Sequence, residues 1–140
     1  MPKFTFAAEN EGFDKHIQLS IRGYNDLWSD VLKFSEYFIE DGTTVVDIGC
    51  STGKLLKAMK KQNDGHAPDC IYKGIEIEED FYSNLLDNDN LEFYKMDVRG
   101  FDWDSVAKNC SLITSIFTLQ FIPKRDRSAM IGQIFNALSV

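Results

Sequence analysis

A buried strand that runs directly into a glycine turn and then a helix is the feature that most constrains this chain. Residues 44–48 are mostly β-branched and suit a strand covered on both faces. From Lys54 onward, apolar residues at helical spacing predict an amphipathic helix. Gly49 and Gly53 permit a tight turn between them, and the free N–H groups of a helix start favour an anionic or carbonyl oxygen. This arrangement is typical of an α/β sheet that holds a nucleotide.

Three other motifs share this Gly-x-Ser-x-Gly string, and the sequence argues against each. The nucleophile elbow of α/β-hydrolases needs a histidine well downstream of the serine, whereas His16 precedes Ser51 and His66 follows only one helix later. A phosphate-binding loop needs a magnesium-binding Ser or Thr where Leu55 stands. The dinucleotide fingerprint needs a glycine at Ser51 and a longer loop, so a pyrophosphate has little room. A nucleoside that carries no phosphate fits the turn better.

Acidic residues end the next two predicted strands. Residues 71–76 are predicted to form a strand that ends in Glu76, whose carboxylate can accept both hydroxyls of a ribose. Residues 91–97 are predicted to form a strand that ends in Asp97, which is placed to accept a hydrogen bond from an adenine amino group. Either acid alone also fits a solvated turn residue or a helix cap. Together with the glycine turn, the two acids favour a nucleoside site.

With these motifs, the chain resembles the class I S-adenosylmethionine-dependent methyltransferases. The first motif of that superfamily is Asp/Glu-x-Gly-x-Gly/Ser-x-Gly, and an acid ends its second strand; the matching residues are Asp47, Gly49, Ser51, Gly53 and Glu76. Within the superfamily, the chain is similar to the carboxy-S-adenosylmethionine synthase family at residues 13–24 and at the Phe-Thr-Leu-Gln-Phe run of residues 117–121. The resemblance covers residues 6–138.

The resemblance implies a fold and a function. The fold is an α/β, Rossmann-like sheet with helices on both faces and, in a complete member, seven strands in the spatial order 3-2-1-4-5-7-6. The function is a small-molecule transferase that uses S-adenosylmethionine and prephenate to make a carboxylated sulfonium cofactor for the wobble uridine of tRNA. The sequence contains no evident general base, so the catalytic residues stay unassigned and the chemistry would rest on the proximity of a reactive sulfonium.

The resemblance also implies roles for individual residues. The cofactor-binding residues would be Tyr24 at the methionine or sulfonium end, Asp47, Gly49, Cys50, Ser51 and Gly53 around the methionine portion, Glu76 with Ile77 at the ribose, and Asp97 with Val98 at the adenine. Two positions depart from the family, because Arg22 replaces a proline and Ile116 replaces a ligand-contacting asparagine. Arg22 or Arg99 could supply a cation for an anionic substrate. The departure at Ile116 favours plain S-adenosylmethionine over its carboxylated derivative.

The length predicts one domain over residues 1–140, with a helical leader at 1–42 and a βαβ nucleoside-binding half at 43–140. The last three strands of the family fold would be missing, together with the arginine that binds the extra carboxylate of the carboxylated cofactor. The strand predicted at 110–117 would then be an apolar edge, which is a template for pairing. We therefore expect this edge to meet a second copy of the chain or a partner chain.

Charge and composition restrict the partners. The net charge of −7 disfavours direct binding to tRNA, which needs a basic surface, and favours a small-molecule substrate. No stretch approaches the roughly 20 apolar residues of a membrane span, and Met1–Ala7 does not resemble a signal peptide. The three cysteines fall in or beside predicted strands without metal-ligand spacing, so we expect reduced core residues, no metal site and a cytoplasmic protein.

Two functions from other classes stay open. The chain could be a non-catalytic module that binds S-adenosylmethionine, or half of a two-chain enzyme, because strands of the family fold would be missing. It could also be an interaction protein that uses the strand edge, with a vestigial pocket.

Aromatic residues are expected to pack helices against the sheet rather than to contact a ligand; they are Phe81, Tyr82, Phe101 and Trp103.

Overall fold

Four parallel strands form the centre of the molecule. The computed structural model describes residues 10–139, so the Met1–Ala7 segment lies outside the described residues. The strands are β1 (Thr44–Ile48), β2 (Ile71–Glu76), β3 (Leu91–Lys95) and β4 (Cys110–Thr114). Their spatial order is β3-β2-β1-β4, and every pairing is parallel. This order confirms the first four positions of the predicted Rossmann-like sheet.

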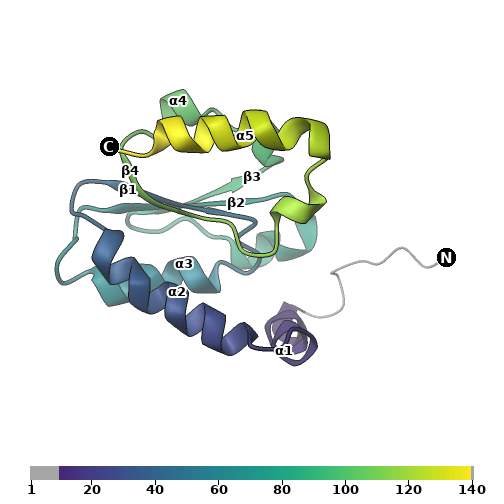
Figure 1. The fold of residues 1–140 in the computed structure, drawn as a ribbon. Coiled ribbons are helices and arrows are strands. Elements are labelled where there is room, and N and C mark those ends of the chain that lie inside the picture. Colours follow the sequence, from purple (N-terminus) through teal and green to yellow (C-terminus); the bar gives the residue numbers. More distant parts are fainter. Residues whose placement is uncertain (1–9, 140) are drawn as a thin grey trace.

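Helices cover both faces of this sheet (Figure 1). On one face lie α1 (Asn10–Ser20), α2 (Tyr24–Phe38) and α3 (Lys54–Asn63), and on the other lie α4 (Trp103–Val106) and α5 (Lys124–Ala137). Three short 3-10 helices, η1 (Glu79–Asn84), η2 (Val98–Gly100) and η3 (Leu119–Phe121), follow the carboxyl ends of β2 and β3 and the segment after β4. Within residues 10–139, no helix combines the length and the apolar character needed to cross a bilayer.

The sheet separates two apolar cores because neighbouring strand residues point to opposite faces. Val45 packs into the core beneath α2 and α3, whereas Val46 packs into the core beneath α4 and α5. Both side chains are fully buried, which explains the run of β-branched residues in β1. Phe101 and Trp103 pack edge to face in the second core with ring centroids 5.0 Å apart, as predicted. All three cysteines are buried and free.

Strands β3 and β4 end earlier than the sequence predicts. The Asp97 carboxylate accepts a hydrogen bond from the Arg99 backbone N–H at 2.9 Å and caps η2, so β3 ends at Lys95. After β4 ends at Thr114, Phe117 adopts a φ of 53°, which no strand residue adopts. The residues between each strand end and the following helix therefore become part of the surface at the carboxyl edge of the sheet.

The outer side of β4 begins to pair with the end of the described chain. The Ser139 backbone N–H donates to the Cys110 carbonyl at 2.9 Å, and Leu138 forms an isolated parallel bridge with Cys110. The remainder of β4 has no strand on this side within residues 10–139. The outer backbone of β4 thus accepts a parallel neighbour at its first residue.

Candidate functional site

The glycine turn after β1 folds back over the end of β2. Gly49 has a φ of 73°, and its backbone N–H donates to the Ile75 carbonyl at 2.8 Å. A β-carbon at Gly49 would collide with the side chain of Thr118, whose hydroxyl donates to the Ile48 carbonyl at 3.1 Å. Both the positive φ and the close approach therefore require glycine here. The turn brings β1, β2 and the segment after β4 together.

Cys50 is part of this turn, and its side chain faces the sheet. A β-carbon on Gly74 of β2 would lie 2.8 Å from the Cys50 sulfur and 2.7 Å from the Phe93 ring. Burial raises the pKa of the Cys50 thiol strongly, and the nearby Asp47 and Glu76 carboxylates raise it further. A thiol that stays protonated is a poor nucleophile. Cys50 therefore packs the turn against the sheet.

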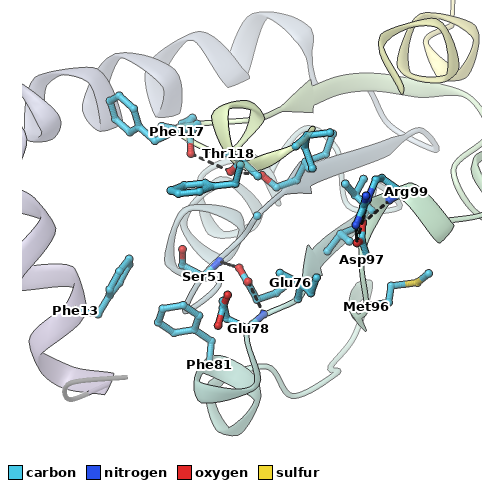
Figure 2. A pocket seen from close by; sticks show the side chains of 18 of the residues that line it. Phe13, Ser51, Glu76, Glu78, Phe81, Met96, Asp97, Arg99, Phe117 and Thr118 are labelled. Atoms are coloured by element: carbon cyan, nitrogen blue, oxygen red, sulfur yellow. Dashed lines mark hydrogen bonds and ion pairs between the residues drawn. The ribbon is translucent and has the colours of Figure 1, made fainter. Parts of the chain in front are cut away.

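Glu76 at the end of β2 is held by two backbone groups (Figure 2). One carboxylate oxygen accepts from the Ser51 N–H at 2.7 Å, and the other accepts from the Glu78 N–H at 2.9 Å. Burial raises the pKa of Glu76, and these backbone hydrogen bonds counteract the rise. Each carboxylate oxygen has a second lone pair, so the fixed carboxylate can accept two further donors, as ribose hydroxyls would provide.

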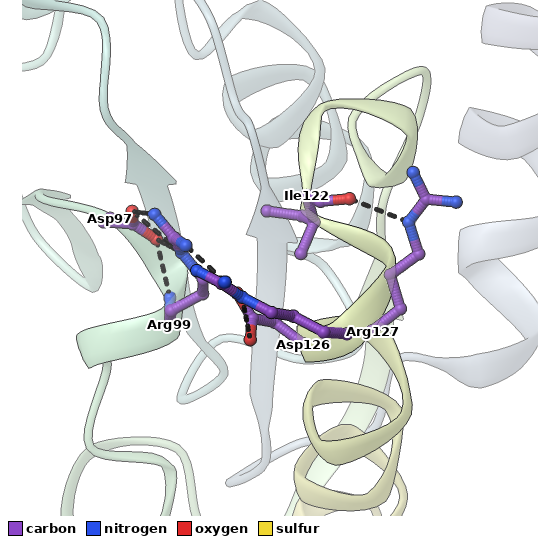
Figure 3. Close-up of polar contacts among 6 residues, drawn as sticks. Asp97, Arg99, Ile122, Asp126 and Arg127 are labelled. Carbon is purple, nitrogen blue, oxygen red and sulfur yellow. Dashed lines mark hydrogen bonds and ion pairs between the residues drawn. The ribbon is translucent and has the colours of Figure 1, made fainter.

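Asp97 is already engaged by an arginine, which the sequence interpretation did not foresee (Figure 3). The Arg99 guanidinium donates to the Asp97 carboxylate at 2.6 Å and reaches Asp126 of α5 at 3.1 Å. The side-chain hydrogen bond from Arg99 is the main cause that lowers the pKa of Asp97. An adenine amino group would have to share this carboxylate with Arg99. Arg99 is thereby committed to two acids and is a poor candidate for binding an anionic substrate.

Two adjoining cavities open at the carboxyl edge of the sheet. One has a volume of about 320 Å³ and contains Glu76, Ile77, Asp97 and Val98 in its wall. The other, about 290 Å³, contains Tyr24, Asp47 and Cys50. We call them the nucleoside cavity and the amino-acid cavity, after the parts of the ligand that the sequence predicts at their wall residues. Their walls share five residues, Ile17, Gly49, Ser51, Ile116 and Phe117. One elongated ligand could therefore occupy both, with its middle at the glycine turn.

Asp47 is buried at the wall of the amino-acid cavity. Its carboxylate accepts a hydrogen bond from the Thr114 hydroxyl at 2.7 Å. Burial raises the pKa of Asp47 to about 7; the Thr114 hydrogen bond opposes this rise, and the Glu76 charge adds to it. At neutral pH this group can thus either accept hydrogen bonds as a carboxylate or donate one as an acid.

The predicted site residues lie together with one exception. All of them except Gly53 line one or both cavities. Gly53 instead precedes α3 with a φ of 74°, and a β-carbon there would lie 3.0 Å from the Phe93 ring. Its position supports the turn without contributing to a cavity wall. Ile116, which replaces the asparagine of the resembling family, lies where the two cavities meet.

Sequence reasoning missed several wall residues. The rings of Phe13 in α1 and Phe81 in η1 pack edge to face, with centroids 4.8 Å apart, and both rings line the nucleoside cavity. Phe81 was expected to pack a helix against the sheet rather than to contact a ligand. Lys54 lines the amino-acid cavity, and its Nζ lies 5.6 Å from the centroid of the Trp28 ring. The signal for Phe117 and Thr118 was present in the Phe-Thr-Leu-Gln-Phe run, but nothing in that run indicates which side chains face the cavity.

This fold, with two cavities at the carboxyl edge of its parallel sheet, is that of a methyltransferase-type α/β domain. The methyltransferase domain family matches residues 45–140, and the chain belongs to that family. The carboxy-S-adenosyl-L-methionine synthase of Staphylococcus epidermidis is 33% identical, and the match covers 98% of this chain and 59% of that protein. The carboxy-S-adenosyl-L-methionine synthase of Shewanella oneidensis is 30% identical, and the match covers 97% of this chain and 57% of that protein. The chain thus spans less than two thirds of the length of these relatives.

Solved methyltransferase structures share the fold. A putative S-adenosyl-L-methionine-dependent methyltransferase from Methanococcus maripaludis superposes with a TM-score of 0.64 at 18% identity, covering 99% of this chain and 62% of that one. CalS10, an amino pentose methyltransferase from Micromonospora echinaspora solved with bound S-adenosylmethionine, gives a TM-score of 0.66 at 17% identity, covering 91% and 52%. At such identities the likeness supports the Rossmann-like architecture alone.

Proposed function

We propose that this protein binds S-adenosylmethionine across the two cavities and acts as a transferase of the methyltransferase superfamily. The adenosine would occupy the nucleoside cavity, and the methionine portion would occupy the amino-acid cavity. The cofactor supplies an electrophilic sulfonium, and the residues of this chain orient it and shield it from water. Relatives named as carboxy-S-adenosyl-L-methionine synthases support a cofactor of this class.

The geometry of Glu76 carries this proposal. Two backbone N–H groups hold the carboxylate at 2.7 and 2.9 Å, so its orientation is fixed before a ligand arrives. The side chain lies at the carboxyl end of β2 in the wall of the nucleoside cavity, where open α/β sheets bind ligands. A preorganised acceptor suits the paired hydroxyls of a ribose, because both can donate to one carboxylate.

Calorimetry on wild type and Glu76→Gln tests the proposal. S-adenosylmethionine and S-adenosylhomocysteine should bind the wild type, whereas NAD, with its pyrophosphate, should not. The Gln variant keeps the size of the side chain but loses half of the acceptor capacity, so we expect affinity to fall by roughly tenfold or more. Glu79→Gln in η1 is the matched control, since Glu79 does not line either cavity. Equal affinities for wild type and Glu76→Gln would contradict the assignment of the ribose acceptor.

We further propose plain S-adenosylmethionine as the cofactor, a small-molecule acceptor and a cytoplasmic location. The likeness to carboxy-S-adenosyl-L-methionine synthases makes prephenate the first acceptor to assay and a role in tRNA modification the first pathway to examine. Prephenate is anionic and needs a cation. Of the basic residues in the cavity walls, Arg99 is paired with two acids, which leaves Lys54 as the candidate. Assays with and without prephenate, on wild type and Lys54→Met, test this assignment.

The outer edge of β4 supports a second proposal, that a further strand from another copy or a partner adds in parallel. The hydrogen bond from Ser139 N–H to the Cys110 carbonyl marks the start of such a pairing. The helices that flank β4 each expose an apolar pair at i, i+4 spacing. These pairs are Phe34 and Phe38 on α2 and Ile131 and Phe135 on α5.

Light scattering at high micromolar concentration tests the edge proposal. Wild type should form a dimer or a larger assembly, and Phe135→Ser should weaken the assembly by removing apolar contact area. Leu19→Ser on α1 is the matched control, because Leu19 is more exposed than Phe135 but lies on a different helix. A monomeric wild type, or equal weakening by both substitutions, would reject the edge as an interface.

A further inference from the structure

An aromatic ring, Phe117, lies where the nucleoside and amino-acid cavities meet, and a second ring, Tyr24, stacks on it from the amino-acid cavity. Phe117 is in the walls of both cavities, and Tyr24 is in the wall of the amino-acid cavity. Their rings are stacked, with centroids 6.2 Å apart and an interplanar angle of 26°. Across the nucleoside cavity from Phe117 lie Glu76 and Phe81 (Figure 2). A ligand that extends from one cavity into the other must therefore pass Phe117, on whose ring Tyr24 stacks.

The backbone at Phe117 is held in an unfavourable conformation. Its φ of 53° lies in the left-handed region, which is sterically unfavourable for a bulky side chain. The adjacent Thr118 hydroxyl donates to the Ile48 carbonyl at 3.1 Å and so fixes this segment above β1. Strain of this kind concentrates at ligand-binding sites, where it positions a side chain. Here it keeps a large aromatic ring 40% exposed at the junction of the cavities.

The charges around the junction favour a cation. The cavity walls contain five acidic side chains, Asp14, Asp47, Glu76, Glu78 and Asp97, and two basic ones, Lys54 and Arg99. Arg99 pairs with Asp97 and Asp126, so the charges of the two wall residues Arg99 and Asp97 offset each other. Burial raises the pKa of Tyr24, and the charges of Asp14 and Asp47 raise it further, so its ring stays uncharged. The other charged side chains in the walls are Asp14, Asp47, Glu76, Glu78 and Lys54, so the walls carry an excess of acidic groups, of which Asp47 is partly ionised at neutral pH.

We propose that Tyr24 and Phe117 form an aromatic clamp that distinguishes the positively charged sulfonium of the cofactor from the neutral thioether of the product. This inference rests on the proposed function, because it assumes that an adenosyl sulfonium spans the cavities. A cation close to an aromatic face is attracted by the ring quadrupole, whereas a neutral thioether lacks that attraction. The clamp therefore holds the charged substrate and releases the product once the group has been transferred.

Paired binding measurements test the clamp. We would titrate S-adenosylmethionine and S-adenosylhomocysteine into wild type, Phe117→Leu and Tyr24→Leu, and compare the ratio of the two dissociation constants. Leucine retains apolar contact but removes the ring. Each substitution should weaken the sulfonium ligand by about threefold to thirtyfold and change thioether affinity by less than about twofold. Phe135→Leu on α5 is the aromatic control, because it lies outside both cavities and should leave the ratio unchanged.

An analogue that carries an ammonium group in place of the sulfonium gives a second readout. Its affinity should fall in the same two variants, because the clamp recognises charge rather than sulfur. If Phe117→Leu does not fold, Phe117→Gly replaces it, since glycine adopts this φ without strain. Equal weakening of charged and neutral ligands, or no change in either, would overturn the clamp. Absence of binding to folded wild type would instead overturn the proposed function, and the clamp with it.

Discussion

At the scale of single residues, Asp47 links the site to stability. Its folded pKa of about 7 lies well above its ordinary value of 3.8, because the carboxyl group is buried. Between these two pH values the folded state retains the proton that the unfolded state loses. The free energy of unfolding therefore decreases as pH rises from 3.8 to about 7, and this contribution is constant above that range. The total effect is on the order of a few kcal/mol.

Asp47→Asn should remove much of this pH dependence. The amide keeps an oxygen that can accept from the Thr114 hydroxyl, but it never ionises. The free energy of unfolding in urea should therefore differ less between about pH 4.5 and about pH 8 for the variant than for wild type. At the higher pH the variant should be more stable than wild type. Asp69→Asn, at an exposed site, should preserve the wild-type difference. An unchanged pH dependence in Asp47→Asn would contradict the raised pKa.

At the scale of elements, the glycine turn packs closely against β2 because Gly74 of β2 has no side chain. Gly74→Ala would place a β-carbon 2.7 Å from the Phe93 ring and 2.8 Å from the Cys50 sulfur. We expect a loss of roughly 1–3 kcal/mol in the free energy of unfolding from overpacking. Gly132→Ala is the matched control, because Gly132 lies inside α5 with no atom near its added β-carbon. That substitution should stabilise the protein by about 1 kcal/mol.

Urea unfolding curves of the two alanine variants provide the comparison. Opposite signs are expected, since the same methyl group enters a filled space in one variant and improves helix propensity in the other. Destabilisation by both substitutions to a similar extent would show that the close approach at Gly74 is not the cause.

The elements also show how much of the fold and the candidate site was predictable. The bounds predicted for β1 and β2 are those observed, because β1 is mostly β-branched and ends in a glycine turn, and β2 ends in an acid. The ends of β3 and β4 were wrong because they depend on tertiary contacts, the Arg99–Asp97–Asp126 pairing and the left-handed Phe117. Periodicity also does not reveal that Phe81 faces a cavity, since buried core and cavity wall have the same composition.

At the scale of the whole molecule, net charge determines the class of partner. A net charge of −7 repels a polyanion, and the lysine with access to a cavity, Lys54, is one residue rather than a basic surface. The protein should therefore not retard tRNA in a gel at physiological salt, even at micromolar concentration. Retardation that weakens steeply with added salt would contradict this prediction and indicate direct RNA binding.

One adenosyl ligand should span both cavities, and amide chemical-shift mapping during a titration with S-adenosylmethionine is the measurement that tests this proposal. We expect saturable shifts with little change along the outer side of β4. The shifts should occur at Gly49–Gly53, at Glu76 and Ile77, at Asp97 and Val98, and at Phe117 and Thr118. Absence of shifts in these segments, or shifts confined to β4 and the exposed apolar pairs of α2 and α5, would show that no such ligand binds across the cavities.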